Sequence, residues 1–265
     1  MSDHFVQRVG GILSADIAVP EHEREMRFYS RVLSTGENPL WREDLMNNRG
    51  MPIIGIGERS EEYAGLPLQW MPHIQVADVA ASVTRALELG GSELMHGKDD
   101  DGKSQWAVLC DPNSAAFGLI PVVSEEEPPS NEGTASPETA TPVGRISWLD
   151  LTVSNAAATR DFYRQVIGWS VQDVEMEDAG ERYADYNMLG DDGNLAAGVC
   201  HARGVNLGLP PIWILYLPVG EIAVSLRRVR EEGGKVIKDS TEADGRYAYA
   251  LVEDPVGAIL ALVPE

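Results

Sequence analysis

The spacing of apolar and polar positions in the second half of the chain predicts a repeating order of strands and helices. Residues 146–153 form an apolar run with partial alternation, which is typical of a strand. A helix follows, in which apolar residues recur at helical spacing between Ser154, a possible N-cap, and Gly168. Three further strands are predicted at 169–174, 182–189 and 195–201.

The same order returns once more before the chain ends. The run at 212–219 predicts a strand, and residues 222–232 predict an amphipathic helix that ends at Gly233–Gly234. The closing strands are predicted at 235–238, 247–252 and 258–263, with a turn at Asp254–Pro255 before the last. The first half follows the same order, with a weaker signal between Glu37 and Asp44. Each half is therefore predicted to read βαβββ twice.

The two halves also repeat one another in sequence. The segment FYSRV at 28–32 recurs as FYRQV at 162–166, a shift of 134 residues. Further along, the shift is 143, and it pairs Trp70 with Trp213 and Asp111–Pro112 with Asp254–Pro255. Chance does not keep so many pairs in register, and a period above one hundred residues indicates repeated domains rather than a solenoid. The chain is thus predicted to be a tandem duplication.

A polar stretch separates the halves. Residues 124–142 contain no large apolar side chain and are rich in Pro, Glu, Ser and Thr. Such a segment cannot bury enough surface to offset the entropy of ordering it. We therefore expect a flexible acidic linker at 124–143, between domains at about 8–123 and 144–265.

This order of elements resembles the vicinal oxygen chelate superfamily, which includes glyoxalase I, fosfomycin and bleomycin resistance proteins, and extradiol dioxygenases. The resemblance rests on the paired βαβββ units, the FY pair late in the first helix of each half, and DP–x–G before the final strand. The segment WLDLTVSNAAATRDFYRQVIGW is similar to the two-domain, glyoxalase-like branch. The resemblance covers nearly the whole chain outside the linker. It implies an α+β fold in which paired modules form a curved mixed sheet around a cavity.

Metal-dependent members of this superfamily hold a divalent ion, their usual cofactor, with His, Gln or Glu on strands that face the cavity. The resemblance places these ligands at positions that hold other residues here: Ser14, Met71 and Gly118 in the first half, and Trp148, Ile214 and Ala261 in the second. Neither half keeps the three or four N or O donors that such an ion needs. We therefore predict no metal ligand and no cofactor.

Polar residues remain on the strands that the resemblance directs into each cavity. A period of two places Asp16 in the first half and Asp150 in the second on the cavity-facing side. Both are candidate buried carboxylates, which need a hydrogen-bond donor or a raised pKa. His73 can serve Asp16 and Tyr216 can serve Asp150; alternatively, each Asp binds backbone amides of the neighbouring module. The candidate cavity residues are Ser14, Asp16, Met71, His73, Trp148, Asp150, Ile214 and Tyr216.

Charge and composition narrow the range of partners. The chain has 42 acidic and 21 basic residues, a formal net charge of -21, which disfavours nucleic acid and strongly anionic ligands. No apolar run approaches the ~18 residues of a membrane span, and the first residues lack a signal-peptide pattern. We expect a cytoplasmic, acidic protein whose partner is a small molecule rather than nucleic acid or a membrane.

Two classes of function remain open, and no catalytic residue is assigned. The favoured one is a protein like the bleomycin resistance members, which binds a small, partly apolar, neutral or cationic molecule without a metal. The alternative is an enzyme: a metal-dependent, glyoxalase-like lyase, a ring-cleavage dioxygenase-like enzyme, or one with Asp16 or Asp150 as general base. The tandem copy supplies within one chain the pairing that single-domain relatives obtain by dimerising. We therefore expect a monomer, with a homodimer as the alternative.

Overall fold

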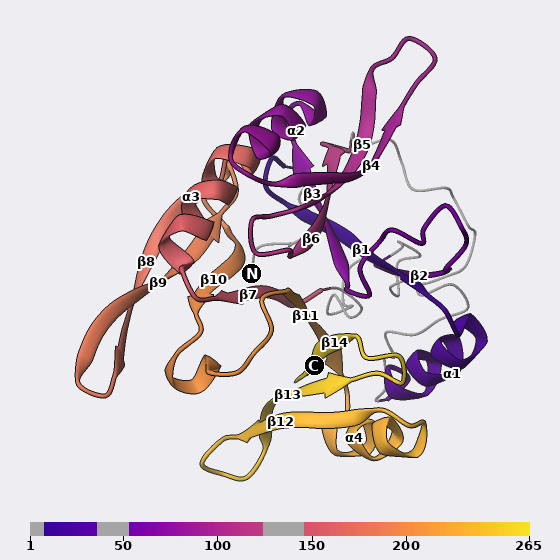
Figure 1. The fold of residues 1–265 in the computed structure, drawn as a ribbon. Helices are drawn as coiled ribbons and strands as arrows, with labels where there is room; N and C mark the ends of the chain where they lie inside the picture. Colours follow the sequence, from indigo (N-terminus) through magenta and orange to yellow (C-terminus); the bar gives the residue numbers. More distant parts are fainter. Residues whose placement is uncertain (1–7, 36–52, 124–145) are drawn as a thin grey trace, which may run out of the picture.

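The computed structural model describes residues 8–35, 53–123 and 146–265, in which two mixed β-sheets carry four α-helices (Figure 1). The first sheet has six strands in the order β2-β1-β3-β6-β5-β4. Its elements and their helices are β1 (Ile12–Val19), α1 (His22–Val32), β2 (Ile54–Glu58), β3 (Met71–Val76), α2 (Val79–Glu88), β4 (Ser92–Lys98), β5 (Ser104–Cys110) and β6 (Ala116–Pro121).

The second sheet has eight strands in the order β12-β13-β14-β11-β7-β10-β9-β8. Its elements are β7 (Trp148–Val153), α3 (Ala156–Ile167), β8 (Ser170–Asp178), β9 (Glu181–Leu189), β10 (Leu195–His201), the 3₁₀ turn η1 (Gly204–Asn206), β11 (Trp213–Val219), α4 (Ile222–Glu231), β12 (Lys235–Thr241), β13 (Tyr247–Glu253) and β14 (Ile259–Pro264). Two mixed sheets with separate helices are the α+β arrangement that the resemblance implied, and that prediction is confirmed.

The second sheet contains both predicted βαβββ units. Helix α3 begins one residue later than predicted, because the side chain of Asn155 rather than Ser154 accepts the Ala158 N–H at 3.1 Å. It ends at Gly168, whose φ of 91° is the left-handed conformation that glycine adopts without strain. In the first half, residues 36–52 lie outside the described residues, and so does the linker predicted at 124–143.

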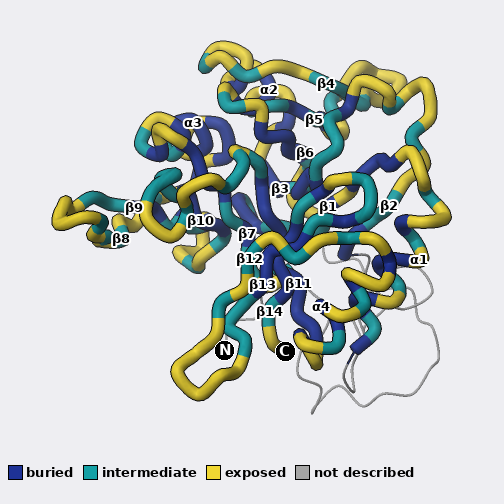
Figure 2. The backbone as a smooth tube through the Cα atoms, turned by 60° about the horizontal axis from the view of Figure 1, so that its bottom comes forward, coloured by how far each residue is buried: buried dark blue, intermediate teal, exposed yellow. Residues whose placement is uncertain are grey.

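The central strands of the two sheets pair in the same register. In the first sheet, β1 runs antiparallel to β3 with Asp16 opposite Met71. In the second, β7 runs antiparallel to β11 with Asp150 opposite Ile214. Figure 2 shows that β3, β7 and β11 are mostly buried. The internal repeat therefore places equivalent residues at equivalent positions of two sheets.

Two tryptophans of the repeat fill the core on the helix side of the sheets, as predicted. Trp70 and Trp213 are both fully buried. The Trp70 indole donates to the Tyr29 hydroxyl at 3.3 Å, and the Trp213 indole donates to the Tyr163 hydroxyl at 2.9 Å. Each indole thus buries a large apolar surface while its N–H keeps a partner.

The helices of the two halves pack crosswise. Helix α1 packs against α4, and α2 packs against α3 (Figure 1). Phe117 of the first half meets Phe162 of the second edge to face, with ring centroids 6.2 Å apart. None of the described helices is long and apolar enough to cross a membrane.

Candidate functional site

One face of the first sheet borders a cavity of about 620 Å³, a volume within the usual range of small-molecule sites. We call this cavity the first cup. It is lined by Asp16, Ile17, Ala18, Gly55, Ile56, Gly57, Tyr63, Leu66, Met71, His73, Met95, Gln105, Trp106, Val108 and Ile120. Apolar side chains thus form most of the wall, and the charged or titratable groups are confined to Asp16, His73 and Tyr63.

Three polar side chains from β1 and β3 meet at the edge of the first cup. Ser14 and His73 are cross-strand partners, and the Ser14 hydroxyl lies 2.9 Å from His73 Nδ1. His73 Nε2 lies 3.5 Å from an Asp16 carboxylate oxygen. Burial lowers the pKa of His73, although the nearby Asp16 charge opposes the shift. The imidazole is therefore neutral at neutral pH and can accept or donate one proton.

Asp16 differs from the prediction that it would be buried. Its side chain is 53% exposed and faces the first cup. Its neighbour on β2 is Gly55, which has no side chain to cover it, so the carboxylate keeps its water. A Cβ on Gly55 would lie 2.3 Å from Asp16 Oδ1, and one on Gly118 would lie 2.6 Å from His73 Cδ2. Both glycines thus leave room for a side chain of the neighbouring strand.

The equivalent face of the second sheet, at Trp148, Asp150, Ile214 and Tyr216, is called the second cup. Here the Trp148 indole donates to Asp150 Oδ1 at 2.6 Å, and the Tyr216 hydroxyl is a second donor to the same carboxylate. Burial raises the pKa of Asp150. A Cβ on Gly198 would lie 2.1 Å from Asp150 Oδ1. The donors to Asp150 are therefore aromatic side chains. Of the two predicted alternatives, this is the one with Tyr216 as a partner, and not the one with backbone amides of the neighbouring module.

Larger side chains occupy the second cup. Trp148 and Tyr216 stand where the first cup has Ser14 and His73. Beneath them Ile214, Leu251 and Ala261 form a buried cluster, and the side chains packed against it are Leu209, Ile212, Tyr216 and Tyr249. The second cup thus carries bulkier side chains than the first at these two equivalent positions.

The donors in the first cup do not match a resident divalent ion. The positions that hold ligands in metal-dependent relatives carry Ser14, Met71 and Gly118. Asp16 and His73 supply only two strong donors, and no group of three or more His, Cys, Asp or Glu that could hold an ion occurs among the described residues. The residues present therefore do not fit the ion of the metal-dependent relatives.

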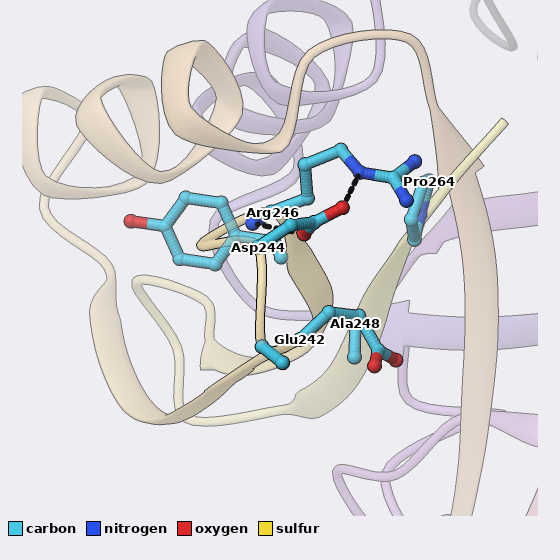
Figure 3. Close-up of a pocket in the computed structure, with 7 residues that line it drawn as sticks. Glu242, Asp244, Arg246, Ala248 and Pro264 are labelled. Carbon is cyan, nitrogen blue, oxygen red and sulfur yellow. Dashed lines mark hydrogen bonds and ion pairs between the residues drawn. The ribbon is translucent and has the colours of Figure 1, made fainter.

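A second hollow, of about 490 Å³, lies at the turn between β12 and β13 (Figure 3). Two of its charged residues pair with each other, since Arg246 Nε donates to Asp244 Oδ2 at 2.7 Å. Their side chains are 82% and 52% exposed, so water already solvates them. This hollow offers no desolvated polar group to a ligand, and we regard the first cup as the candidate site.

Several wall residues of the first cup were not selected from the sequence. Met95 comes from β4, and Gln105 and Trp106 come from β5. Trp106 is 39% exposed and is the largest side chain in the wall. The repeat offered a signal, because the shift of 143 pairs Trp106 with the aromatic Tyr249.

Known proteins resemble both halves of the chain. The profile of the Glyoxalase/Bleomycin resistance protein/Dioxygenase superfamily matches residues 145–262, and that of a glyoxalase-like domain matches residues 14–120. CFP32 of Mycobacterium tuberculosis, which carries the provisional name of a glyoxylase, is 26% identical over 199 residues, 75% of this chain and 70% of that protein. The anthracycline biosynthesis protein DnrV of Streptomyces peucetius is 29% identical over 131 residues, 45% of this chain and 46% of that protein.

A solved structure shares the fold. A variant of homoprotocatechuate 2,3-dioxygenase from B. fuscum superposes with a TM-score of 0.55 at 15% identity, covering 98% of this chain and 73% of that one. Two matched profiles, two similar sheets and this shared fold lead to one conclusion. The chain belongs to the glyoxalase, bleomycin resistance protein and dioxygenase superfamily.

Proposed function

We propose that the protein binds a small, partly apolar molecule in the first cup without a resident metal ion. The observation that carries this proposal is the 620 Å³ cavity with its apolar wall and one Asp16–His73 pair. Binding needs only a shaped cavity and a few oriented polar groups, which the first cup has. Since the two halves pair within one chain, a monomer is sufficient for this function.

The wall and the polar edge together define the kind of ligand. Met71 and Met95 are flexible side chains that adapt to an apolar body, and Trp106 offers a flat aromatic surface. Ionised Asp16 only accepts hydrogen bonds, so it favours a ligand with a donor or a positive charge. The net charge of -21 disfavours anions at long range. We therefore expect a neutral or cationic ligand with an apolar ring or chain.

An enzyme is the second candidate function, favoured by one observation. His73 Nε2 lies 3.5 Å from Asp16 at the edge of the cavity, a separation that closes easily when a substrate binds. Asp16 or His73 could then act as general base toward a bound molecule. Among the relatives, the provisional glyoxylase CFP32 and the B. fuscum dioxygenase carry the names of enzymes, so lyase and ring-cleavage substrates belong in any test.

A thermal-shift screen followed by calorimetry tests the proposal. Neutral and cationic aromatic compounds, hemithioacetals and catechols are added to the protein in EDTA, and then with Mn²⁺, Fe²⁺ or Zn²⁺. We expect a ligand that raises Tm in EDTA, binds once per chain and is not converted. Asp16→Asn should weaken a cationic ligand about tenfold, since a charge-assisted hydrogen bond is lost. The exposed Asp244→Asn, at the other hollow, is the matched control and should bind normally.

Three results would argue against binding alone. Metal-dependent turnover of a hemithioacetal or a catechol would identify the lyase or the dioxygenase alternative. Turnover in EDTA that Asp16→Asn abolishes would identify a metal-free enzyme. One Fe, Zn, Ni or Mn per purified chain after dialysis would contradict the absence of a resident ion.

A further inference from the structure

Two equivalent contacts join the halves, and each places a helix tyrosine on an aspartate turn of the other half. In the first contact, Tyr29 of α1 donates its hydroxyl to Asp254 Oδ2 at 2.7 Å. In the second, the Tyr163 hydroxyl of α3 lies within hydrogen-bonding reach of Asp111. The repeat relates Tyr29 to Tyr163 and Asp254 to Asp111. The two contacts can therefore be compared residue by residue, to see which hydrogen-bond donors each buried aspartate has.

The second contact satisfies its carboxylate with donors from several groups. Asp111 Oδ1 accepts the backbone N–H groups of Asn113 and Ala115 at 2.8 and 2.9 Å. Its other oxygen accepts Asn113 Nδ2 at 3.0 Å, and the same amide donates to Thr159 Oγ1 at 2.9 Å. Together with Tyr163, these donors compensate the burial of one charge.

The first contact lacks the side-chain donor. Asp254 Oδ1 still accepts the backbone N–H groups of Val256 and Ala258 at 3.1 and 2.8 Å. Val256 stands in the place of Asn113 and has no amide to offer, while Glu25 stands in the place of Thr159.

Glu25 completes the first contact only if it carries a proton. Its residue is fully buried, and neither carboxyl oxygen has a hydrogen-bond partner while both acids are ionised. The group nevertheless lies within hydrogen-bonding reach of Asp254. Two carboxylates can only accept, so they repel each other here. A protonated Glu25 becomes a donor to Asp254, the role that Asn113 has toward Asp111.

We propose that a proton shared between Glu25 and Asp254 locks the first contact, and that its loss loosens this contact while the second stays closed. The proposal concerns the joint between the halves and is independent of what the first cup binds.

The surrounding charges support the lock. Burial and the charge of Asp254 raise the pKa of Glu25 to about 8, with Glu21 adding to the rise and Arg24 opposing it. Tyr29 faces the pair as a neutral donor, since burial raises its pKa well above the ordinary value. The charged groups at the neighbouring α1–α4 and β12–β13 contacts already have opposite partners: Arg27 and Arg31 pair with Glu232, and Lys235 pairs with Glu253.

The direction of the pH effect follows from the raised pKa. A group that holds its proton more tightly in the folded state stabilises fully below its ordinary pKa of 4.5. This contribution is lost as pH rises through the folded value of about 8. The first contact should therefore weaken between about pH 5 and pH 9.

Four proteins measured from pH 5 to pH 9 test the lock: the wild type, Glu25→Gln, Glu25→Thr and Thr159→Glu. Gln is a permanent donor of the same shape, and Thr copies the second contact. Hydrogen exchange, corrected for the intrinsic effect of pH, should increase in α1 and the 254–258 turn of the wild type and stay constant in α3 and the 111–115 turn. Tm of the wild type should fall by several degrees over this range, and Glu25→Gln should flatten the curve.

The reciprocal variant sharpens the test. Thr159→Glu should make exchange at the second contact more pH-dependent between pH 5 and pH 9 than it is in the wild type. Equal pH responses of the two contacts in the wild type would overturn the proposal, and so would an unchanged slope in both Glu25→Gln and Glu25→Thr. If Glu25→Gln does not fold, the pH dependence of Glu25→Thr and the hydrogen exchange of the wild type still test whether the proton on Glu25 stabilises the first contact.

Discussion

The two cups occupy the same place in two repeated sheets, and yet their side chains differ. The first cup has Ser14 and His73 beside a cavity of about 620 Å³, whereas the second has Trp148 and Tyr216 at the equivalent positions. Both have an aspartate on the first strand of the half, Asp16 in one and Asp150 in the other, with a glycine beside it on the next strand of the sheet. Asp150 is partly buried and has two aromatic donors, whereas Asp16 is half-exposed and has His73 at 3.5 Å. A buried carboxylate needs such donors, and an exposed one does not. The backbone therefore provides two equivalent positions, and the cups differ in the size of the side chains there and in the exposure of the aspartate.

The largest expected effect is on stability, when the glycine beside each aspartate is replaced by alanine. It should distinguish Asp150, which two aromatic side chains hold, from Asp16, which is half-exposed. Gly198→Ala places a Cβ 2.1 Å from Asp150 Oδ1, which Trp148 and Tyr216 hold in place. We expect a loss of about 2 kcal/mol in unfolding free energy, the usual cost of overpacking. Gly55→Ala makes an equally close approach to Asp16, but that side chain can turn into the open cup. Its cost should stay below about 0.5 kcal/mol.

Urea denaturation of the two alanine variants, with the wild type alongside, measures this difference. Equal losses in both would mean that Asp16 is held as firmly as Asp150, and the contrast between the cups would fail. A crystal structure of Gly55→Ala should show the Asp16 side chain rotated toward the cavity.

A smaller effect is expected from removing the charge of each aspartate. Because burial raises the pKa of Asp150, its stabilising contribution is full below the ordinary value of 3.8 and is lost as pH rises through the folded value. Asp150→Asn should therefore unfold with a flatter pH dependence than the wild type, and be more stable by roughly 1 kcal/mol at pH 7. Asp16 is 53% exposed, so Asp16→Asn should change Tm at pH 7 less than Asp150→Asn does.

Thermal denaturation at pH 4, 5, 6 and 7 checks both variants. A Tm for Asp150→Asn that is lower than wild type at pH 7 would show that the charged form is the favoured partner of Trp148 and Tyr216. Tyr216→Phe is a useful control, since it removes one of the two donors to Asp150 without changing the volume of the ring.

The smallest effect concerns the imidazole at the edge of the first cup. Burial lowers the pKa of His73, and the Asp16 charge partly restores it. Asp16→Asn should therefore lower this pKa further, and Ser14→Ala should change it less because Ser14 is uncharged. NMR titration of the His73 ring protons measures these shifts. A rise of the pKa in Asp16→Asn would show that the 3.5 Å pair does not act as a charge pair.

The sequence alone was sufficient to predict which residues share a strand position in the two halves. Periodicity predicts which face of a strand a residue is on, and the repeat predicts its counterpart in the other half. The equivalence of Asp16 with Asp150 and of Met71 with Ile214 follows from these two patterns. The exposure of Asp16 could not be predicted in this way. It depends on Gly55 and on wall residues such as Trp106, which reach the cup from strands distant in sequence.

The crosswise contacts show a similar limit. The repeat of the FY and DP motifs was visible in the sequence, but their contact with each other was not. The FY tyrosine of each half contacts the DP aspartate of the other half, and a local pattern cannot show this. Strand ends were also underestimated: β8 continues to Asp178, since its polar outer part pairs with β9 as an exposed arm. A charged, largely exposed hairpin lacks the apolar alternation by which strands are predicted.

The crosswise helices have a consequence for how such a protein can diverge. Two separate copies would meet only at their free concentration, whereas a covalent connection gives each contact an effective concentration on the order of millimolar. Under that condition one well-satisfied contact, at Asp111 and Asn113, keeps the partner surfaces of the other in place. A buried glutamate beside Asp254, which needs a proton to donate a hydrogen bond, can then be accommodated at the other contact. The covalent connection between the halves thus allows two equivalent contacts to differ in sequence, with Glu25 and Val256 in one and Thr159 and Asn113 in the other.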